Sequence, residues 1–390
     1  MHQFMALVDK VHTRRQHGAH QAMHAHSGRV QAMSHPERNA MVTSEDVARL
    51  AGVSQATVSR TFSGSARVSD AARAKVEAAA ATLGYEPDAA AQSLVRSTSK
   101  TIALSGAFGH DQALLSLLTR PDLYFYIGVL RALQTRATDV GYDLLMPSRP
   151  ERPDSSSYVR RLRSRKVAGV ITLGAPEEAQ RQALLESAIP TVFIDAVGSG
   201  PKATYVSSDN VDGARQAVRH LLELGHRRIA RIAVPEAVLP GRDRIAGARA
   251  ALAERGVTED PRLVIASDWT PEGAYDATVT LLNSGVQFTA VVAESDIEAF
   301  AVIRALTDQG LRVPEDVSVI GFDDLDLCTL MRPALTTVHQ DVDQIGAKAV
   351  ETLLQIIEQD SAPGPVEIPA HVVVRDSTAP PPSMSGLRPR

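Results

Sequence analysis

The stretch around position 57 carries side chains whose chemistry suits the edges of DNA bases. Gln55 can bind adenine and Arg60 can bind guanine through two hydrogen bonds each, and Ala56 can touch a thymine methyl group. Small hydroxyl side chains beside them suit contacts with backbone phosphates. The predicted DNA contacts in this stretch are Thr43, Ser54, Gln55, Ala56, Thr57, Ser59, Arg60 and Ser63.

Two short helices are expected to position these side chains. Thr43 can cap the first helix, with Asp46 three residues later. At helical spacing, Val47, Leu50 and Ala51 then share one apolar face, which is expected to pack on a second helix.

The tight turn at 52–54 joins the two helices. Its glycine ends the first helix, and its serine can cap the second, which is expected over 55–62. Val58 and Phe62 share a face that can pack inward, so the base-contacting side chains point away. Because a helix pair without base contacts has the same geometry, spacing alone leaves a plain packing unit as the alternative.

Two further helices follow. Ser69 can cap a third helix that Gly84 ends. Pro87 then marks the start of a short helix that exposes Leu94, and a solitary helix of this length should order only when something, such as DNA, packs against it. Ala91 and Leu94 complete the predicted DNA-binding set; alternatively, Leu94 is a core residue buried by its neighbours.

The runs Thr43–Arg60, Val68–Ser69 and Leu83–Pro87 together resemble the headpiece of the LacI/GalR family of bacterial transcription regulators. The resemblance implies a hinge helix that pairs with its dimer mate in the minor groove, where Leu94 wedges between base pairs. Many relatives carry arginine or lysine where this chain has Gln92, so the hinge contact is expected to be weaker or differently selective.

The composition is that of a globular protein of more than one domain. The 390 residues are 44% hydrophobic and 22% charged, with a net charge of -4, so any basic DNA-binding surface must be local. Cys328 is the only cysteine, which excludes an internal disulfide and fits the cytoplasm. There is no apolar run of membrane-spanning length and no secretory signal pattern.

Residues 1–40 hold seven of the twelve histidines. A disordered extension before a natural start near Met41 is the favoured interpretation, and an arm that binds metal or DNA is the alternative. The chain is thus divided into a disordered His-rich extension at 1–40, a headpiece at 41–86, a hinge helix and linker at 87–100, a first lobe at 101–207 plus 340–365, a second lobe at 208–339 plus 366–376, and a disordered tail at 377–390.

After the hinge, apolar strands alternate with helices, which predicts parallel sheets of the α/β class. Strands are expected at 101–105, 142–146, 168–173, 190–194, 228–234, 263–266, 289–293, 317–321 and 371–374, and the longest helices at 122–140, 209–224, 241–255, 271–283, 296–309 and 341–357. Two doubly wound lobes of this kind place a ligand in the crevice at their strand ends.

This long region resembles the two-lobed, periplasmic-binding-protein-like core of the same family, in runs such as 208–214, 224–230 and 310–324. The implied fold is an α-helical helix-turn-helix headpiece with a hinge helix, joined to a two-lobed α/β core. An arginine fork and a carboxylate can hold vicinal hydroxyls while an aromatic face stacks on a ring. The effector contacts that the resemblance implies are Tyr124, Phe125, Arg244, Trp269, Ser295 and Asp323.

Each of these residues has a plainer interpretation. Trp269 could be core, Asp323 could cap the next segment, and Arg244 could form a surface salt bridge. Ser295 stands where sugar-responsive relatives commonly carry asparagine, and the loop from Gly106 to Pro121 is longer than usual. The serine replaces a bidentate amide by a single hydroxyl, and the longer loop could reshape the pocket, cover it or only decorate the first lobe.

The sequence lacks the signals that two other function classes require. An enzyme would need a catalytic motif, and the chain has no Walker loop, no Gly-x-Ser-x-Gly and no His-Glu-x-x-His. A transport-binding protein would need export and no headpiece. We therefore predict a cytoplasmic homodimeric repressor without cofactor or metal, which binds operator DNA and an effector, with a sugar or sugar derivative as the first candidate and a nucleobase or nucleoside as the second.

Overall fold

The computed structural model describes residues 42–62, 68–85, 99–106, 120–147, 155–234 and 236–382. The chain divides into two compact units, which meet in sequence at Pro87 and Asp88. The predicted extension 1–40, the DNA-contacting candidates Ser63, Ala91 and Leu94, and most of the loop from Gly106 to Pro121 lie outside the described residues.

Over its described residues, 42–62 and 68–85, the first unit is a small headpiece with three helices. The Thr43 side chain accepts from the Asp46 backbone and the Asp46 carboxylate accepts from the Thr43 backbone, which confirms the predicted cap. Gly52 ends that helix with φ +66°, a conformation that glycine adopts without strain. The helices are α2 (Ser44–Ala51), α3 (Gln55–Phe62) and α4 (Asp70–Leu83).

A compact apolar core holds the headpiece together. Its centre is Val47, Val58 and Val76, each at most 1% exposed. The prediction that Leu50 belongs to this core is wrong, because the inner face of α2 is centred on Val47 and Ala48 and Leu50 is 54% exposed.

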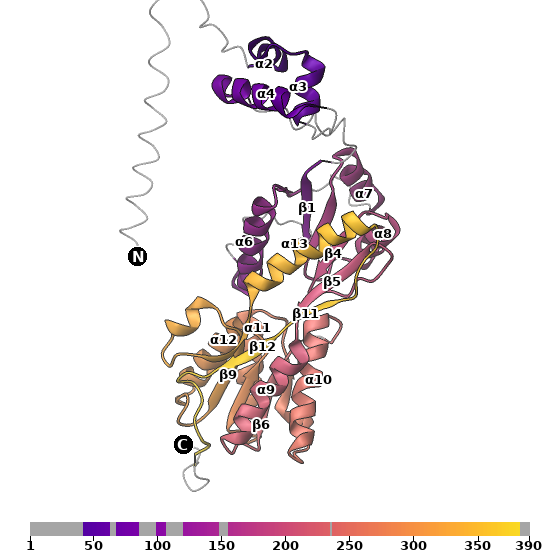
Figure 1. Cartoon of the computed structure of the whole chain (residues 1–390). Coiled ribbons are helices and arrows are strands. Elements are labelled where there is room, and N and C mark those ends of the chain that lie inside the picture. The colour runs from indigo at the N-terminus through magenta and orange to yellow at the C-terminus, as the bar shows by residue number, and fades with distance from the viewer. Residues whose placement is uncertain are drawn as a thin grey trace, which may run out of the picture. The chain divides into compact units, whose positions relative to one another are not determined.

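The second unit consists of two α/β lobes, each built on a six-stranded sheet (Figure 1). In the first lobe the strand order is β11-β5-β4-β3-β1-β2, and every neighbouring pair is parallel. Its strands are β1 (Thr101–Gly106), β2 (Asp143–Leu145), β3 (Gly169–Leu173), β4 (Thr191–Ile194), β5 (Ala203–Ser208) and β11 (Val366–Ile368).

The second lobe repeats this plan with the order β12-β10-β9-β8-β6-β7. Only the edge pair of β10 and β12 is antiparallel among its described strand pairs. The strands are β6 (Ile229–Ala233), β7 (Val264–Ala266), β8 (Ala290–Ala293), β9 (Ser318–Asp323), β10 (Thr336–Gln340) and β12 (Ala370–Val373).

Helices cover both faces of each sheet because alternate strand residues are apolar on both sides. In the first lobe, α6 (Tyr124–Asp139) and α13 (Val342–Gln359) pack opposite α7 (Ser155–Ser164) and α8 (Glu178–Glu186). In the second lobe, α9 (Asn210–Glu223) and α10 (Leu239–Glu254) pack opposite α11 (Pro271–Asn283) and α12 (Asp296–Asp308). The 3-10 turns are η2 (Pro121–Leu123), η3 (Pro261–Leu263) and η4 (Asp326–Thr329).

The chain crosses between the lobes at Asp209, Asp341 and Pro369. The last crossing corrects a predicted boundary, which placed everything from 366 to 376 in the second lobe. Val366 pairs in parallel with Val206, so β11 completes the first lobe and only β12 belongs to the second.

The tail predicted at 377–390 is wrong for its first residues. Ser377 is fully buried: its hydroxyl donates to the Val319 carbonyl at 2.6 Å and accepts from the Thr336 N–H at 2.8 Å. The Ala379 N–H donates to Ser318 Oγ at 3.0 Å. The proline-rich composition predicted disorder, whereas hydrogen bonds to the neighbouring strands hold the start of this segment in place. Residues 383–390 lie outside the described residues.

Candidate DNA interface and interlobe ligand site

The structure separates an inner and an outer face of α3. Val58 and Thr61 are buried, whereas Phe62, predicted to be an inner residue, is half-buried with its ring 5.9 Å from that of Tyr85. The predicted base-contacting residues Gln55, Ala56, Ser59 and Arg60 are all exposed, as the spacing predicted.

Hydroxyl groups extend this outer face. Thr43 and Ser54 are exposed and Thr57 is half-buried. The Ser54 hydroxyl accepts from the Thr57 N–H at 3.2 Å, so it caps α3 as predicted, and Gln55 Nε2 donates to Ser44 Oγ at 2.9 Å. The face can therefore offer an amide, a guanidinium and several hydroxyls, but its contacts with DNA stay a prediction.

Arg244 lies at the centre of the candidate ligand site in the second unit. It is 4% exposed, which excludes the surface salt bridge considered above. Nε donates to Asn210 Oδ1 at 2.8 Å, and Nη1 donates to the Glu294 carbonyl. The guanidinium carbon lies 3.7 Å from the Phe322 ring centroid and 5.5 Å from that of Trp269, so the cation is held against two aromatic faces.

A chain of hydrogen bonds runs from Arg244 into the first lobe. Asn210 Nδ2 donates to Ser207 Oγ at 3.1 Å, and Ser207 Oγ donates to Asp195 Oδ1 at 3.1 Å. Asp195 follows β4 in the first lobe, Asn210 begins α9 at a crossing, and Arg244 belongs to the second lobe. A ligand bound to Asp195 and Arg244 would therefore contact both lobes.

Asp323, the last residue of β9, completes the acidic side of the site. It is 8% exposed and accepts from Gln340 Nε2 at 2.7 Å. Burial, and next the charge of Asp296, raise the pKa of Asp323 well above its ordinary value. Asp324 has a different role, because it accepts from Arg375 Nη2 at 2.6 Å and lies 3.0 Å from His339 Nδ1.

The aromatic candidates have different environments. Trp269 is half-buried, so it is not a core residue, and its φ of +71° is unusual for a bulky side chain. Tyr124 is half-buried at the start of α6, whereas Phe125 is 9% exposed within the first-lobe core. The next residue, Tyr126, is the one that reaches the charged cluster: burial, and next the charge of Asp195, raise its pKa.

Ser295 serves mainly as a helix cap. Its hydroxyl accepts from the Glu298 N–H at 3.2 Å and donates to Glu298 Oε2 at 3.2 Å. Both its donor and one acceptor position are used within the first turn of α12. Its predicted contact with an effector therefore gains no support from this geometry.

Sequence analysis missed four residues of this cluster: Tyr126, Asp195, Asn210 and Gln340. Signals for three of them were present. Asp195 directly follows a predicted strand, Asn210 belongs to the family run 208–214, and Gln340 directly precedes a predicted helix. Ligands of α/β folds bind at the edge where the strands end. Among the described residues, no group of histidine, cysteine and carboxylate side chains is arranged to hold a metal ion.

The raised pKa of Asp195 predicts that the free energy of unfolding of the second unit depends on pH. Its burial raises the pKa from 3.8 to about 6, with the Arg244 charge opposing the rise. The folded state therefore binds the Asp195 proton more tightly than the unfolded state does. The stability that this proton contributes is fully present below the ordinary pKa of 3.8 and is lost as pH rises through about 6. Between about pH 5 and about pH 8, the free energy of unfolding of the second unit should fall by roughly 1 to 1.5 kcal/mol more in the wild type than in Asp195→Asn.

Denaturant unfolding of both proteins at the two pH values measures this difference. The asparagine keeps an acceptor for Ser207, so the variant is a matched reference. Parallel pH profiles for the two proteins would show that Asp195 ionises normally in the folded protein.

Comparison with known proteins agrees with this architecture. Residues 43–88 match the model of bacterial regulatory proteins of the lacI family, and residues 218–378 match a periplasmic binding protein-like domain. The regulator CelR of Thermobifida fusca is 33% identical over 345 residues, which cover 87% of this chain and 99% of that protein. This chain belongs to the LacI family.

Solved structures of family members have the same fold. The lac repressor dimer bound to operator and an anti-inducer superimposes with a TM-score of 0.72 at 31% identity, over 87% of this chain and 99% of the other. A complex of CelR with cellobiose gives 0.64 at 32% identity, over 86% and 99%. The ribose operon repressor of Escherichia coli K12 is 32% identical over 82% of this chain and 94% of its own length.

Family membership decides between the function classes that the sequence left open. This LacI-family chain is a DNA-binding transcription regulator and not an enzyme. Within the described residues, none of the helices has the length and apolar character that a membrane span requires.

Proposed function

We propose that this regulator is a cytoplasmic repressor that binds a pseudo-palindromic operator as a homodimer and is switched by a sugar or sugar derivative. The DNA-binding part of this proposal is supported by one side of α3, which exposes Gln55, Ala56, Ser59 and Arg60. Two copies of such a helix, related by a two-fold axis, suit two half-sites in successive major grooves.

The switch follows from the buried cluster that spans both lobes. A ligand held by Asp195 of the first lobe and Arg244 of the second would favour one angle between the lobes. Operator affinity then changes by the difference between the ligand's affinities for the two angles. The relatives named for cellobiose and ribose support a sugar as the effector.

Arg60→Ala tests the DNA-binding half. The operator is first selected from a random DNA pool with the wild-type protein, and affinities are then measured on that sequence and on its single-base variants. Loss of a bidentate contact to guanine should cost about 1 to 3 kcal/mol and relax selectivity at one base step.

Arg49→Ala is the matched control, because Arg49 lies on α2 and 77% of its side chain is exposed. Any effect of this control should be uniform across DNA sequences, as for a phosphate contact. A uniform loss for Arg60→Ala as well would assign Arg60 to the phosphate backbone and contradict its role in base recognition.

A further inference from the structure

The first lobe carries a strongly basic surface. Five cations occur within seven residues of helix α7 and the turn that follows it, namely Arg160, Arg161, Arg163, Arg165 and Lys166. The sequence has no aspartate or glutamate from 155 to 176, although the net charge of the whole chain is -4. We call these five side chains the α7 basic surface.

Packing turns most of these cations toward solvent. Val159 and Leu162 are buried in the lobe, whereas Arg160, Arg163 and Arg165 are exposed. The other two cations of the surface are half-buried. The helix is therefore amphipathic, with an apolar side against the lobe and a cationic side in solvent.

Repulsion among these cations favours an anionic partner. Arg160 and Arg163 are three residues apart on one helix, a spacing at which like charges are neighbours and destabilise each other. Neither Arg165 nor Lys166 forms an ion pair with any residue that the structure describes. On the adjacent helix α8, the Glu178 carboxylate is already paired at 2.6 Å with an arginine of its own helix. An external polyanion would relieve this repulsion.

The α7 basic surface lies where the chain enters the first lobe from the headpiece. The Lys166 carbonyl accepts from the Ser99 N–H at 3.0 Å and from the Ser99 hydroxyl at 2.8 Å. Ser99 is the first described residue after the segment 86–98, which follows the headpiece. Those thirteen residues span at most about 45 Å when fully extended. The covalent chain thus keeps this surface near any DNA that the headpiece binds.

The arrangement of the cations suits a DNA backbone better than a single small anion. They follow one another along about 10 Å of chain at helical rise. A DNA strand carries one phosphate for about every 3.4 Å of helix axis, so several phosphates can be contacted at once. Four of the five cations are arginines, whose guanidinium groups bind phosphate through two parallel hydrogen bonds.

From the charge of this surface and its place in the chain, we propose that the α7 basic surface binds backbone phosphates of DNA while the headpiece occupies its operator. The contact adds affinity without base recognition, because phosphates carry no sequence information. The proposal rests on the DNA-binding part of the proposed function and adds a second, sequence-independent contact to it.

The double variant Arg165→Gln plus Lys166→Gln tests the proposal, since it removes two positive charges from each chain and keeps long polar side chains. The full-length wild type and the variant are titrated with a DNA fragment of about 40 base pairs, roughly four helical turns, that carries the selected operator at its centre. The titrations are repeated between about 50 and 300 mM salt.

The expected result is a weaker dependence of affinity on salt. The slope of log affinity against log salt concentration should become less steep by about 2 to 3.5 for a dimer, because each lost phosphate contact removes about 0.9. At about 50 mM salt, affinity should fall about 10-fold or more, and by the same factor on the operator and on its single-base variants. Arg60→Ala, in contrast, should change selectivity.

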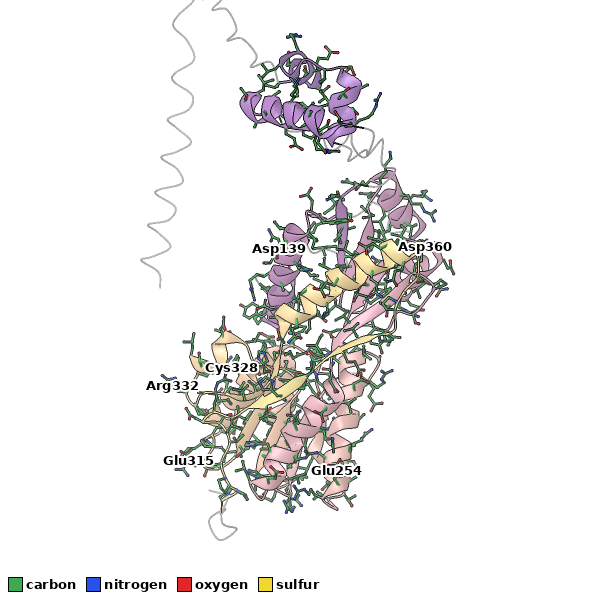
Figure 2. All side chains as sticks on the ribbon, in the orientation of Figure 1. Asp139, Glu254, Glu315, Cys328, Arg332 and Asp360 are labelled. Atoms are coloured by element: carbon green, nitrogen blue, oxygen red, sulfur yellow. The ribbon has the colours of Figure 1, made fainter. Side chains whose placement is uncertain are left out.

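Arg249→Gln plus Arg255→Gln is the matched control. It removes the same number of charges from exposed positions in α10 and directly after it. Figure 2 shows Glu254, the last residue of α10, at the end of the second unit opposite to α7, which Figure 1 labels. The control should keep the wild-type salt slope. Thermal unfolding should show both double variants folded, because exposed charges contribute little to stability.

A wild-type salt slope in Arg165→Gln plus Lys166→Gln would overturn the proposal and leave an acidic protein as the partner that this surface fits. An equal loss of slope in the control would also overturn it, because net charge rather than this surface would then cause the effect. In both cases the selectivity change in Arg60→Ala would still support the proposed function. Failure of the wild type to select any operator would contradict that function itself.

Discussion

Arg244→Lys should occupy its operator and yet fail to respond to the effector. Lysine keeps the positive charge but cannot donate in the fork geometry that joins Asn210 to the Glu294 carbonyl. It also loses the planar contact with Phe322 at 3.7 Å. Hydrogen bonds from a charged donor contribute about 1.5 to 3 kcal/mol each, so effector affinity should fall by about 100-fold or more.

The same change should reduce the stability of the second unit by about 3 kcal/mol, because it weakens a buried charge network. Arg255→Lys is the matched control: the Arg255 side chain is 49% exposed and pairs at 3.1 Å with Glu223, whose side chain is 55% exposed. A surface pair of this kind contributes about 0 to 1 kcal/mol. Thermal unfolding and effector titration of the two variants should differ sharply, and equal effector affinity in both would remove Arg244 from the site.

Val76→Asp should abolish operator binding and leave the second unit folded. Val76 is fully buried in a headpiece core made of few side chains. A buried, unpaired carboxylate costs several kcal/mol, which matches or exceeds the stability that so small a core provides. Operator affinity should therefore fall by more than about 1000-fold, because the unfolded headpiece cannot present α3.

Ala78→Asp adds the same carboxylate to the exposed side of the same helix and is the control. It should keep operator affinity within a few-fold of the wild type. In Val76→Asp, thermal unfolding of the second unit should be unchanged, since the chain forms two separate compact units. Operator binding by Val76→Asp equal to that of Ala78→Asp would show that the headpiece core tolerates the charge.

Local sequence signals predicted the helices of the headpiece. They did not predict those strands of the two sheets that are rich in polar residues. The Thr43 cap, the Gly52 stop and the exposed face of α3 rest on contacts only a few residues apart. In contrast, β5 and β10 were not predicted, since they carry many threonines, serines and other polar residues. Their burial between neighbouring strands, such as β10 between β9 and β12, makes them strands.

The ligand site divides in the same way. Arg244, Trp269 and Asp323 were predicted from a family resemblance, and the structure places Arg244 beside Trp269. Asn210 and Gln340 lie beside crossings between the lobes, and hydrogen bonds through Ser207 and Asn210 join Asp195 of the first lobe to Arg244 of the second. The hydrophobic periodicity of a sequence does not indicate which distant segments come into contact.

The sequence by itself determined the family, the two-unit division, the caps and turns of the headpiece and the outward side of α3, because each depends on a motif or on neighbours within one or two helical turns. Only the tertiary structure decided that β11 returns to the first lobe, that residues 377–382 are held against the second lobe and that Ser295 caps a helix. It alone also placed one buried guanidinium among several carboxyl groups, since charge balance in a site depends on which segments fold together.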